Sequence, residues 1–268
     1  MPAGQFVSND QRLSEQLERM VPKLEVINIS LEGSGTDQQL LLYEDIAARY
    51  EHDLVLLMPF LSNLRRNMVA ARDAIDPHTG QMVLRWKPRF DLVDGELVLR
   101  NVPVPREVPA KNNGAIETDS NQSSFSQAKA ILSAMPGAPS LKRIAYYLLS
   151  WEPFPEFRDE NSSEWKLMTA IVRRFKCIAG QRPLVIAPTF YDNYVRYRMS
   201  RAYWRRFSSL ENIAGVHVID LLPYLKELGK DAIKCFQVPY DMHFSSYGHL
   251  VVADILKFEL GKRGLLSC

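Results

Sequence analysis

An acid and a base stand one residue apart near the end of the chain, in the stretch PYDMHFSSYGHL (239–250). Histidine is the side chain that most often serves as a general base, and a carboxylate bonded to one ring nitrogen fixes its tautomer. Asp241 and His243 are therefore a candidate orienting acid and base at the entrance to an apolar helical pattern. The alternative is that they only help to begin the helix, with Ser245 or Ser246 capping it.

Two further residues could stabilise negative charge on an oxygen atom. Gly33 lies in the turn LEGSGTDQ, where a residue without a side chain can present a bare backbone N–H. Asn63 follows an apolar run, and its amide can donate a hydrogen bond to a developing oxyanion. Each residue alone is typical of an ordinary turn or helix cap. Taken with His243 as the base, the set predicts acyl transfer.

The elements that would bring these residues together follow from the apolar patterns. Continuous apolar runs of strand length indicate parallel strands covered on both faces, and they occupy 53–60, 183–190 and 216–222. An alternating run at 24–30 predicts one more strand. Helical patterns occupy 8–21, 37–50, 140–151, 163–180 and 245–264. Because reactive groups gather at the carboxyl ends of strands in an open α/β sheet, Gly33, Asn63 and His243 are expected to meet there.

One region interrupts the alternation of strands and helices. Residues 68–140 contain a β-hairpin pattern that turns at Asp94-Gly95, followed by a polar, Ser- and Asn-rich loop at 111–127. The sequence therefore predicts the α/β class. We expect a three-layer α/β/α sandwich with a parallel sheet, forming a single domain over 1–268 with an insertion at about 68–140.

Composition excludes several classes of function. A net charge of +2 gives no argument for binding nucleic acid, and no run of about 18 apolar residues could span a bilayer. Cys177, Cys235 and Cys268 lie far apart, and the five histidines lack the spacing of metal ligands. The sequence thus predicts no metal and no cofactor.

The segment 194–207 interleaves arginine with aromatic residues. We favour an amphipathic packing role for it, and binding of an anionic sugar is the alternative.

Taken in their order along the chain, these stretches resemble the sequence blocks of the SGNH, or GDSL-type, hydrolases. Residues 26–67 are similar to the blocks that hold the oxyanion donors, and 239–256 to the block that holds the acid and the histidine. The resemblance implies a flavodoxin-like sandwich and a Ser-His-Asp ester hydrolase. By it, Gly33 and Asn63 are the oxyanion donors, His243 is the base and Asp241 is its orienting acid.

The spacing of the acid and the base departs from the common pattern of that family. The usual form is Asp-x-x-His, whereas this chain has Asp-x-His followed by Phe244. The shorter form resembles branches that include polysaccharide O-acetyl esterases and acetyltransferases. The expected substrate is therefore a small-molecule or glycan ester, with O-acetyl groups on a carbohydrate as one candidate. Hydrolysis and acetyl transfer both stay open.

The Gly-Asp-Ser block that carries the family's nucleophile is absent from the chain. The opening MPAGQFVSNDQRL reads like the residues that follow that block, so we expect the serine immediately before Met1. It would end an upstream strand that lies between 24–30 and 53–60. The compartment stays open, because the chain as written reads as cytoplasmic while an upstream signal or anchor would place it outside.

Serines within the chain are weaker candidates for the nucleophile, because none follows a strand in the sharp turn that a nucleophile needs. These serines are Ser34, Ser62, Ser245 and Ser246. The alternative from a different class is a non-catalytic binding domain that retains the pocket and lacks the nucleophile.

Overall fold

The computed structural model describes residues 4, 7–76, 78–107 and 152–266. The expected helix at 140–151 and the expected polar loop at 111–127 lie outside these residues.

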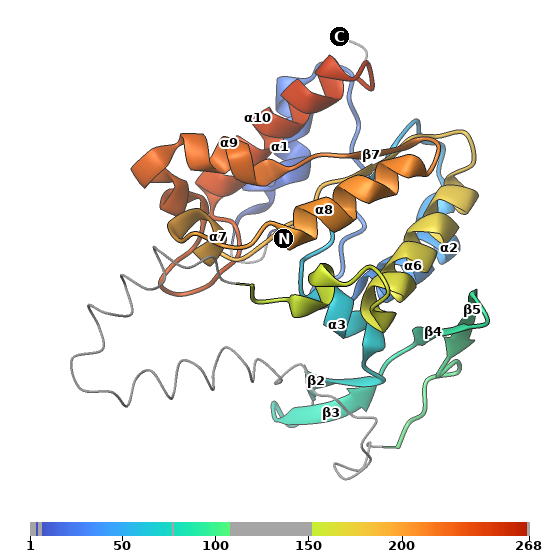
Figure 1. Cartoon of the computed structure of the whole chain (residues 1–268). Coiled ribbons are helices and arrows are strands. Elements are labelled where there is room, and N and C mark those ends of the chain that lie inside the picture. Colours follow the sequence, from blue (N-terminus) through green and yellow to red (C-terminus); the bar gives the residue numbers. More distant parts are fainter. Residues whose placement is uncertain (1–3, 5–6, 77, 108–151, 267–268) are drawn as a thin grey trace.

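A parallel sheet of three short strands lies at the centre of the structure (Figure 1). The strands are β1 (Val55–Leu57), β6 (Leu184–Ile186) and β7 (Val216–Val218), in the order β1-β6-β7. They coincide with the three continuous apolar runs, although each is shorter than its run. Beyond the regular pairing, an isolated bridge between Phe60 and Thr189 carries the contact of β1 with β6 further along the chain.

Helices cover both faces of this sheet, which gives a mixed α/β layering (Figure 1). On one side lie α1 (Leu13–Met20), α9 (Leu221–Glu227) and α10 (Ser246–Lys262). On the other side lie α2 (Thr36–Asp45), α6 (Ser163–Ala179) and α8 (Ala202–Ser209). Two shorter helices, α3 (Asn63–Met68) and α7 (Asn193–Arg196), follow β1 and β6. The described residues also form short 3₁₀ helices, which are η1 (Asn9–Gln11), η2 (Ala47–Arg49), η3 (Pro155–Arg158), η4 (Leu210–Asn212) and η5 (Gly229–Cys235).

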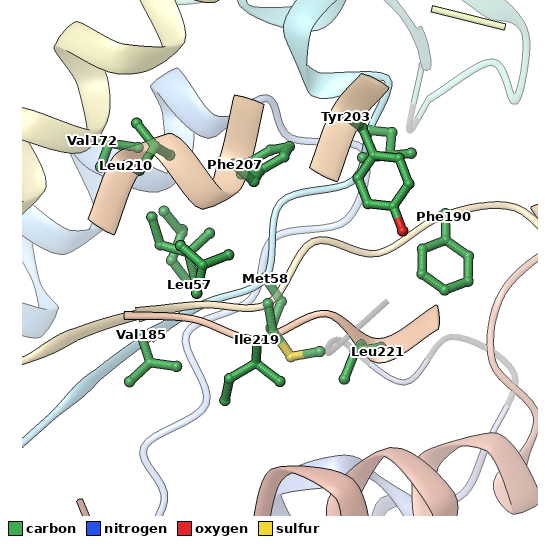
Figure 2. Close-up of a cluster of buried hydrophobic side chains, with 14 of the residues drawn as sticks. Leu57, Met58, Val172, Val185, Phe190, Tyr203, Phe207, Leu210, Ile219 and Leu221 are labelled. Carbon is green, nitrogen blue, oxygen red and sulfur yellow. The ribbon is translucent and has the colours of Figure 1, made fainter. Parts of the chain in front are cut away.

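The core is built from side chains on both faces of the strands. Figure 2 shows Phe207 and Leu210 on one side of the strands, with Val185 and Ile219 on the other. All four are buried. This two-sided burial explains why the strands read as continuous apolar runs rather than as alternating ones.

The expected strand at 24–30 is not part of the sheet. These residues have no regular secondary structure, and no described strand pairs with them. Their hydrogen bonds are local: the Leu24 N–H donates to the Val21 carbonyl, and the Val26 N–H donates to Glu18 Oε1 at 2.7 Å. The prediction of a paired strand is therefore wrong. The alternating pattern indicated an extended conformation, and the neighbour needed for pairing does not lie beside it.

The insertion contains two antiparallel hairpins. The expected hairpin is confirmed as β4 (Arg89–Val93) and β5 (Glu96–Arg100), which turn at Asp94 and Gly95. Both turn residues have positive φ, 51° and 86°, as a type I′ turn requires. A second hairpin, β2 (Ala71–Ile75) with β3 (Met82–Trp86), was not expected.

Candidate functional site

Asp241 and His243 form the contact that an orienting acid and a base require. Asp241 Oδ1 accepts a hydrogen bond from the His243 backbone N–H at 2.7 Å and also contacts His243 Nδ1. A carboxylate at Nδ1 fixes the proton there, so the lone pair of the neutral ring is on Nε2. No described residue is hydrogen-bonded to Nε2. The His243 side chain is 31% exposed, so a substrate can reach it.

The backbone around His243 holds it at the start of α10. The Gln237 N–H donates to the His243 carbonyl at 2.9 Å, and the Ser245 N–H donates to the Cys235 carbonyl at 2.9 Å. Ser245 Oγ accepts the Gly248 N–H at 3.1 Å, which makes Ser245 the N-cap of α10. The capping role considered for this stretch therefore belongs to Ser245, and Asp241 is engaged with the histidine.

Gly33 adopts a backbone conformation that favours glycine. Its φ is +65°, and its N–H makes no hydrogen bond to a described residue. A side chain here would also press on Arg72, whose Nη1 lies 2.9 Å from the position that a Cβ would take. Arg72 Nη1 donates to the Glu32 carbonyl at 3.3 Å, so the insertion supports this turn.

Asn63 is buried at the start of α3 and touches the same turn. Its Nδ2 donates to Thr36 Oγ1 at 3.1 Å, while its Oδ1 has no partner among the described residues. A half-turn of the amide plane lets the Thr36 hydroxyl donate to Oδ1 and releases Nδ2 as a donor. The amide can thus serve as an oxyanion donor in that orientation.

One cavity brings three of the four predicted site residues together. It has a volume of about 1770 Å³, and its lining includes Gly33, Asn63 and His243. Asp241 stands behind His243 and is not part of this lining. Phe60 and Tyr191 line it too, and their rings meet edge to face at 4.5 Å between centroids. Gly33, Asn63 and His243 therefore border the same cavity, and their grouping as one site stays a prediction.

A buried ion pair lies next to the glycine turn, in the first turn of α2. Sequence reasoning missed this pair. Lys87, between β3 and β4, contacts Asp37 in the first turn of α2, and both side chains are almost fully buried. The Asp37 N–H donates to Asn67 Oδ1 at 3.2 Å. Burial raises the pKa of Asp37 and lowers that of Lys87, while each charge opposes the shift of the other. No local pattern joins these residues, because they lie far apart in the sequence and meet only through the insertion.

The serines that the structure describes do not supply a partner for His243. Ser34 Oγ donates to the Leu31 carbonyl at 2.7 Å, Ser245 caps α10, and Ser62 Oγ is buried without a hydrogen-bond partner among the described residues. In the parts of the chain that the structure describes, no serine hydroxyl is hydrogen-bonded to His243.

The arginine- and aromatic-rich segment packs into the protein. Tyr194 and Tyr203 are buried, and their rings meet edge to face. Arg201 pairs with Asp220, and Arg206 donates to the Phe157 carbonyl at 2.9 Å. These contacts agree with the packing role favoured for 194–207.

Within the described ranges, no three His, Cys, Asp or Glu side chains are grouped as metal ligands. Among the helices that the structure describes, none has the length and apolar character to cross a membrane.

Comparison with known proteins gives no match to a family model, a curated protein or a solved structure.

Proposed function

We propose that this chain carries the base, its orienting acid and the oxyanion donors of a serine-dependent ester hydrolase of the SGNH type, acting on an acyl ester such as an O-acetyl group on a carbohydrate. The observation that carries the proposal is the shared cavity lined by Gly33, Asn63 and His243. The Asp241 carboxylate on His243 Nδ1 supports it, because that contact directs the basic nitrogen away from the acid.

The mechanism assigns one role to each of these groups. A serine hydroxyl, supplied by polypeptide that precedes Met1, loses its proton to His243 Nε2 as its oxygen attacks the ester carbonyl. The carbonyl oxygen becomes an oxyanion and accepts hydrogen bonds from the Gly33 N–H and the Asn63 amide. His243 then returns the proton to the departing alcohol, which leaves an acyl-enzyme. Water repeats the sequence, releases the acid and restores the serine.

Two other functions fit the same cavity. A sugar hydroxyl in place of water would make the protein an acetyltransferase. A binding domain without catalysis is the second candidate, favoured by the lack of a serine bonded to His243 within the described residues.

The test is turnover of p-nitrophenyl acetate by the protein extended upstream of Met1. We expect His243→Ala to lower kcat at least about 100-fold and Asp241→Asn to lower it by a similar factor. His78→Ala is the matched control, because His78 lies in an exposed turn of the insertion. An extended protein without turnover would favour the binding domain. Turnover that His243→Ala leaves unchanged would show that the site is assigned wrongly.

A further inference from the structure

Gln39 lies in the first turn of α2, in the wall of the cavity that Gly33 and Asn63 also line. Residues three apart on a helix share a face, so Gln39 is on the side of α2 where Thr36 contacts Asn63. The proposed steps of ester hydrolysis give this side chain no role. Its hydrogen bonds indicate one.

The orientation of the Gln39 amide is set by Ser34. Ser34 Oγ donates its proton to the Leu31 carbonyl at 2.7 Å. Because a hydroxyl has a single proton, Ser34 Oγ can only accept from Gln39, and it accepts from Nε2 at 3.4 Å. A half-turn of the amide would place Oε1 against an oxygen atom that has no proton to give. The amide nitrogen therefore faces Ser34, and the amide oxygen faces away from it.

Gln39 Oε1 is buried and has no hydrogen-bond partner among the described residues. A buried acceptor without a donor is costly, so such groups are normally paired by the protein, by ordered water or by a ligand. Asn63 Oδ1 also has no described partner, but the Thr36 hydroxyl can donate to it when that amide turns. Gln39 lacks this alternative. An acceptor of fixed orientation is therefore left in the cavity wall.

We propose that Gln39 Oε1 accepts a hydrogen bond from a hydroxyl group on the alcohol part of the substrate, which makes the site selective for esters of polyols. The Asn63 amide donates to the ester carbonyl while Gln39 accepts from a neighbouring hydroxyl, so the two amides bind complementary groups. The reaction rests on the proposed function, whereas the contact of Gln39 with a hydroxyl does not.

An ordered water molecule is the competing partner of Gln39 Oε1. A water would donate to Oε1 whichever ester occupies the cavity, so it predicts no preference among substrates. A contact with the substrate predicts a preference for esters that carry a hydrogen-bond donor, because a site built around a hydroxyl rejects an analogue that lacks it.

Two small esters separate these alternatives. Hydroxyethyl acetate and methoxyethyl acetate differ only in the methyl group that replaces the hydroxyl proton. For the protein extended upstream of Met1, we expect kcat/KM to favour the hydroxyl ester at least about 10-fold. Gln39→Leu should abolish this preference. Gln38→Leu is the matched control and should retain it, because Gln38 Oε1 is also buried and unpaired within the described residues but Gln38 does not line the cavity.

Ser34→Ala tests the orientation itself. Without the Ser34 hydroxyl, the Gln39 amide can turn and present its nitrogen as a donor. The amide could then donate to the methoxy oxygen, so we expect the preference for the hydroxyl ester to fall several-fold in this variant.

The contact can also be measured without turnover, on the chain itself. With ¹⁵N-labelled glutamine, the side-chain amide signals of Gln39 are identified by their loss in Gln39→Leu. We expect them to shift on addition of hydroxyethyl acetate and not at the same concentration of methoxyethyl acetate. If Gln39→Leu does not fold, Gln39→Glu identifies the signals and the wild-type shifts decide.

The outcomes distinguish this inference from the proposed function. Equal kcat/KM for the two esters, a preference that survives Gln39→Leu, or identical shifts with both esters would overturn the inference and assign Oε1 to an ordered water only. Turnover that needs His243 would leave the proposed function standing in each of these cases. Hydroxyl-dependent shifts in a protein without turnover would support the contact and refute the proposed function. Glycerol monoacetate and a monoacetylated methyl glucoside both belong to the proposed class, and the faster of the two identifies the polyol.

Discussion

His249 should make the stability of this protein depend on pH in the acidic range. The side chain is 1% exposed, and its Nδ1 accepts the Leu13 N–H that joins α10 to α1. Burial lowers its pKa from 6.5 to about 4. The unfolded chain therefore binds a proton between these two pH values while the folded protein does not. The contribution of the neutral His249 side chain to the free energy of unfolding is therefore fully present above pH 6.5. It is lost as the pH falls from 6.5 to 4.

The size of the effect follows from the same pKa. A difference of about 2.5 pKa units corresponds to about 3 kcal/mol of unfolding free energy, with a maximum slope of about 1.4 kcal/mol per pH unit. Urea unfolding followed by circular dichroism at several pH values between 7.5 and 4 would measure it. Other groups titrate in this range, so the quantity to compare is the difference between the wild type and a variant without the imidazole.

His249→Asn is the suitable variant, because the asparagine carbonyl can still accept the Leu13 N–H. We expect it to cost a fixed amount from altered packing at pH 7.5. The wild-type advantage over this variant should then shrink by about 3 kcal/mol by pH 4. His78→Asn, in an exposed turn, should follow the wild-type curve. A difference between wild type and His249→Asn that stays constant from pH 7.5 to 4 would refute the reasoning.

The other expectations concern stability. Gly248→Ala should destabilise the protein by about 1–3 kcal/mol in urea unfolding, because an added Cβ would lie 2.0 Å from the Cys235 carbonyl oxygen. Gly261→Ala in the same helix meets nothing within 4 Å and should stabilise by about 0.5–1 kcal/mol; equal effects of the two changes would contradict the contact. Lys87→Met should cost about 3–5 kcal/mol, less at acidic pH where Asp37 is protonated, and adding Asp37→Asn should recover most of it. A double variant no more stable than the single one would show that the buried charge is not the cause.

The sequence predicted the central strands because their burial on both faces leaves a plain signal. The runs at 53–60, 183–190 and 216–222 are mostly apolar, and each contains a strand of the sheet. The prediction failed at 24–30, since an alternating pattern reports an extended backbone and not its partner. The β2–β3 hairpin was missed because Ile75 and Met82 are more than 60% exposed, so burial imposes no clean alternation there.

The candidate site divides in the same way. Asp241 and His243 are two residues apart, so chain geometry alone permits the contact that the structure shows. Asn63 was expected at the end of an apolar run that does contain a strand, whereas Gly33 was expected after the run at 24–30, which the sheet does not include. The Lys87–Asp37 pair left no local trace, because a lysine in a polar insertion reads as solvated until the fold buries it. The orientation of the Asn63 amide likewise depends on Thr36, which only the folded backbone brings into reach.

The pairing order of the central sheet also sets the order in which the protein can assemble. Joining β6 to β7 brings together residues about 30 apart in the chain, whereas joining β1 to β6 closes a loop of about 130. The longer closure costs about 1.2 kcal/mol more in chain entropy, and non-local pairing slows folding. During synthesis, β1 emerges from the ribosome long before its partner exists. Until β6 has been synthesised, both edges of the apolar β1 segment stay unpaired. We therefore expect this part of the nascent chain to need protection from aggregation.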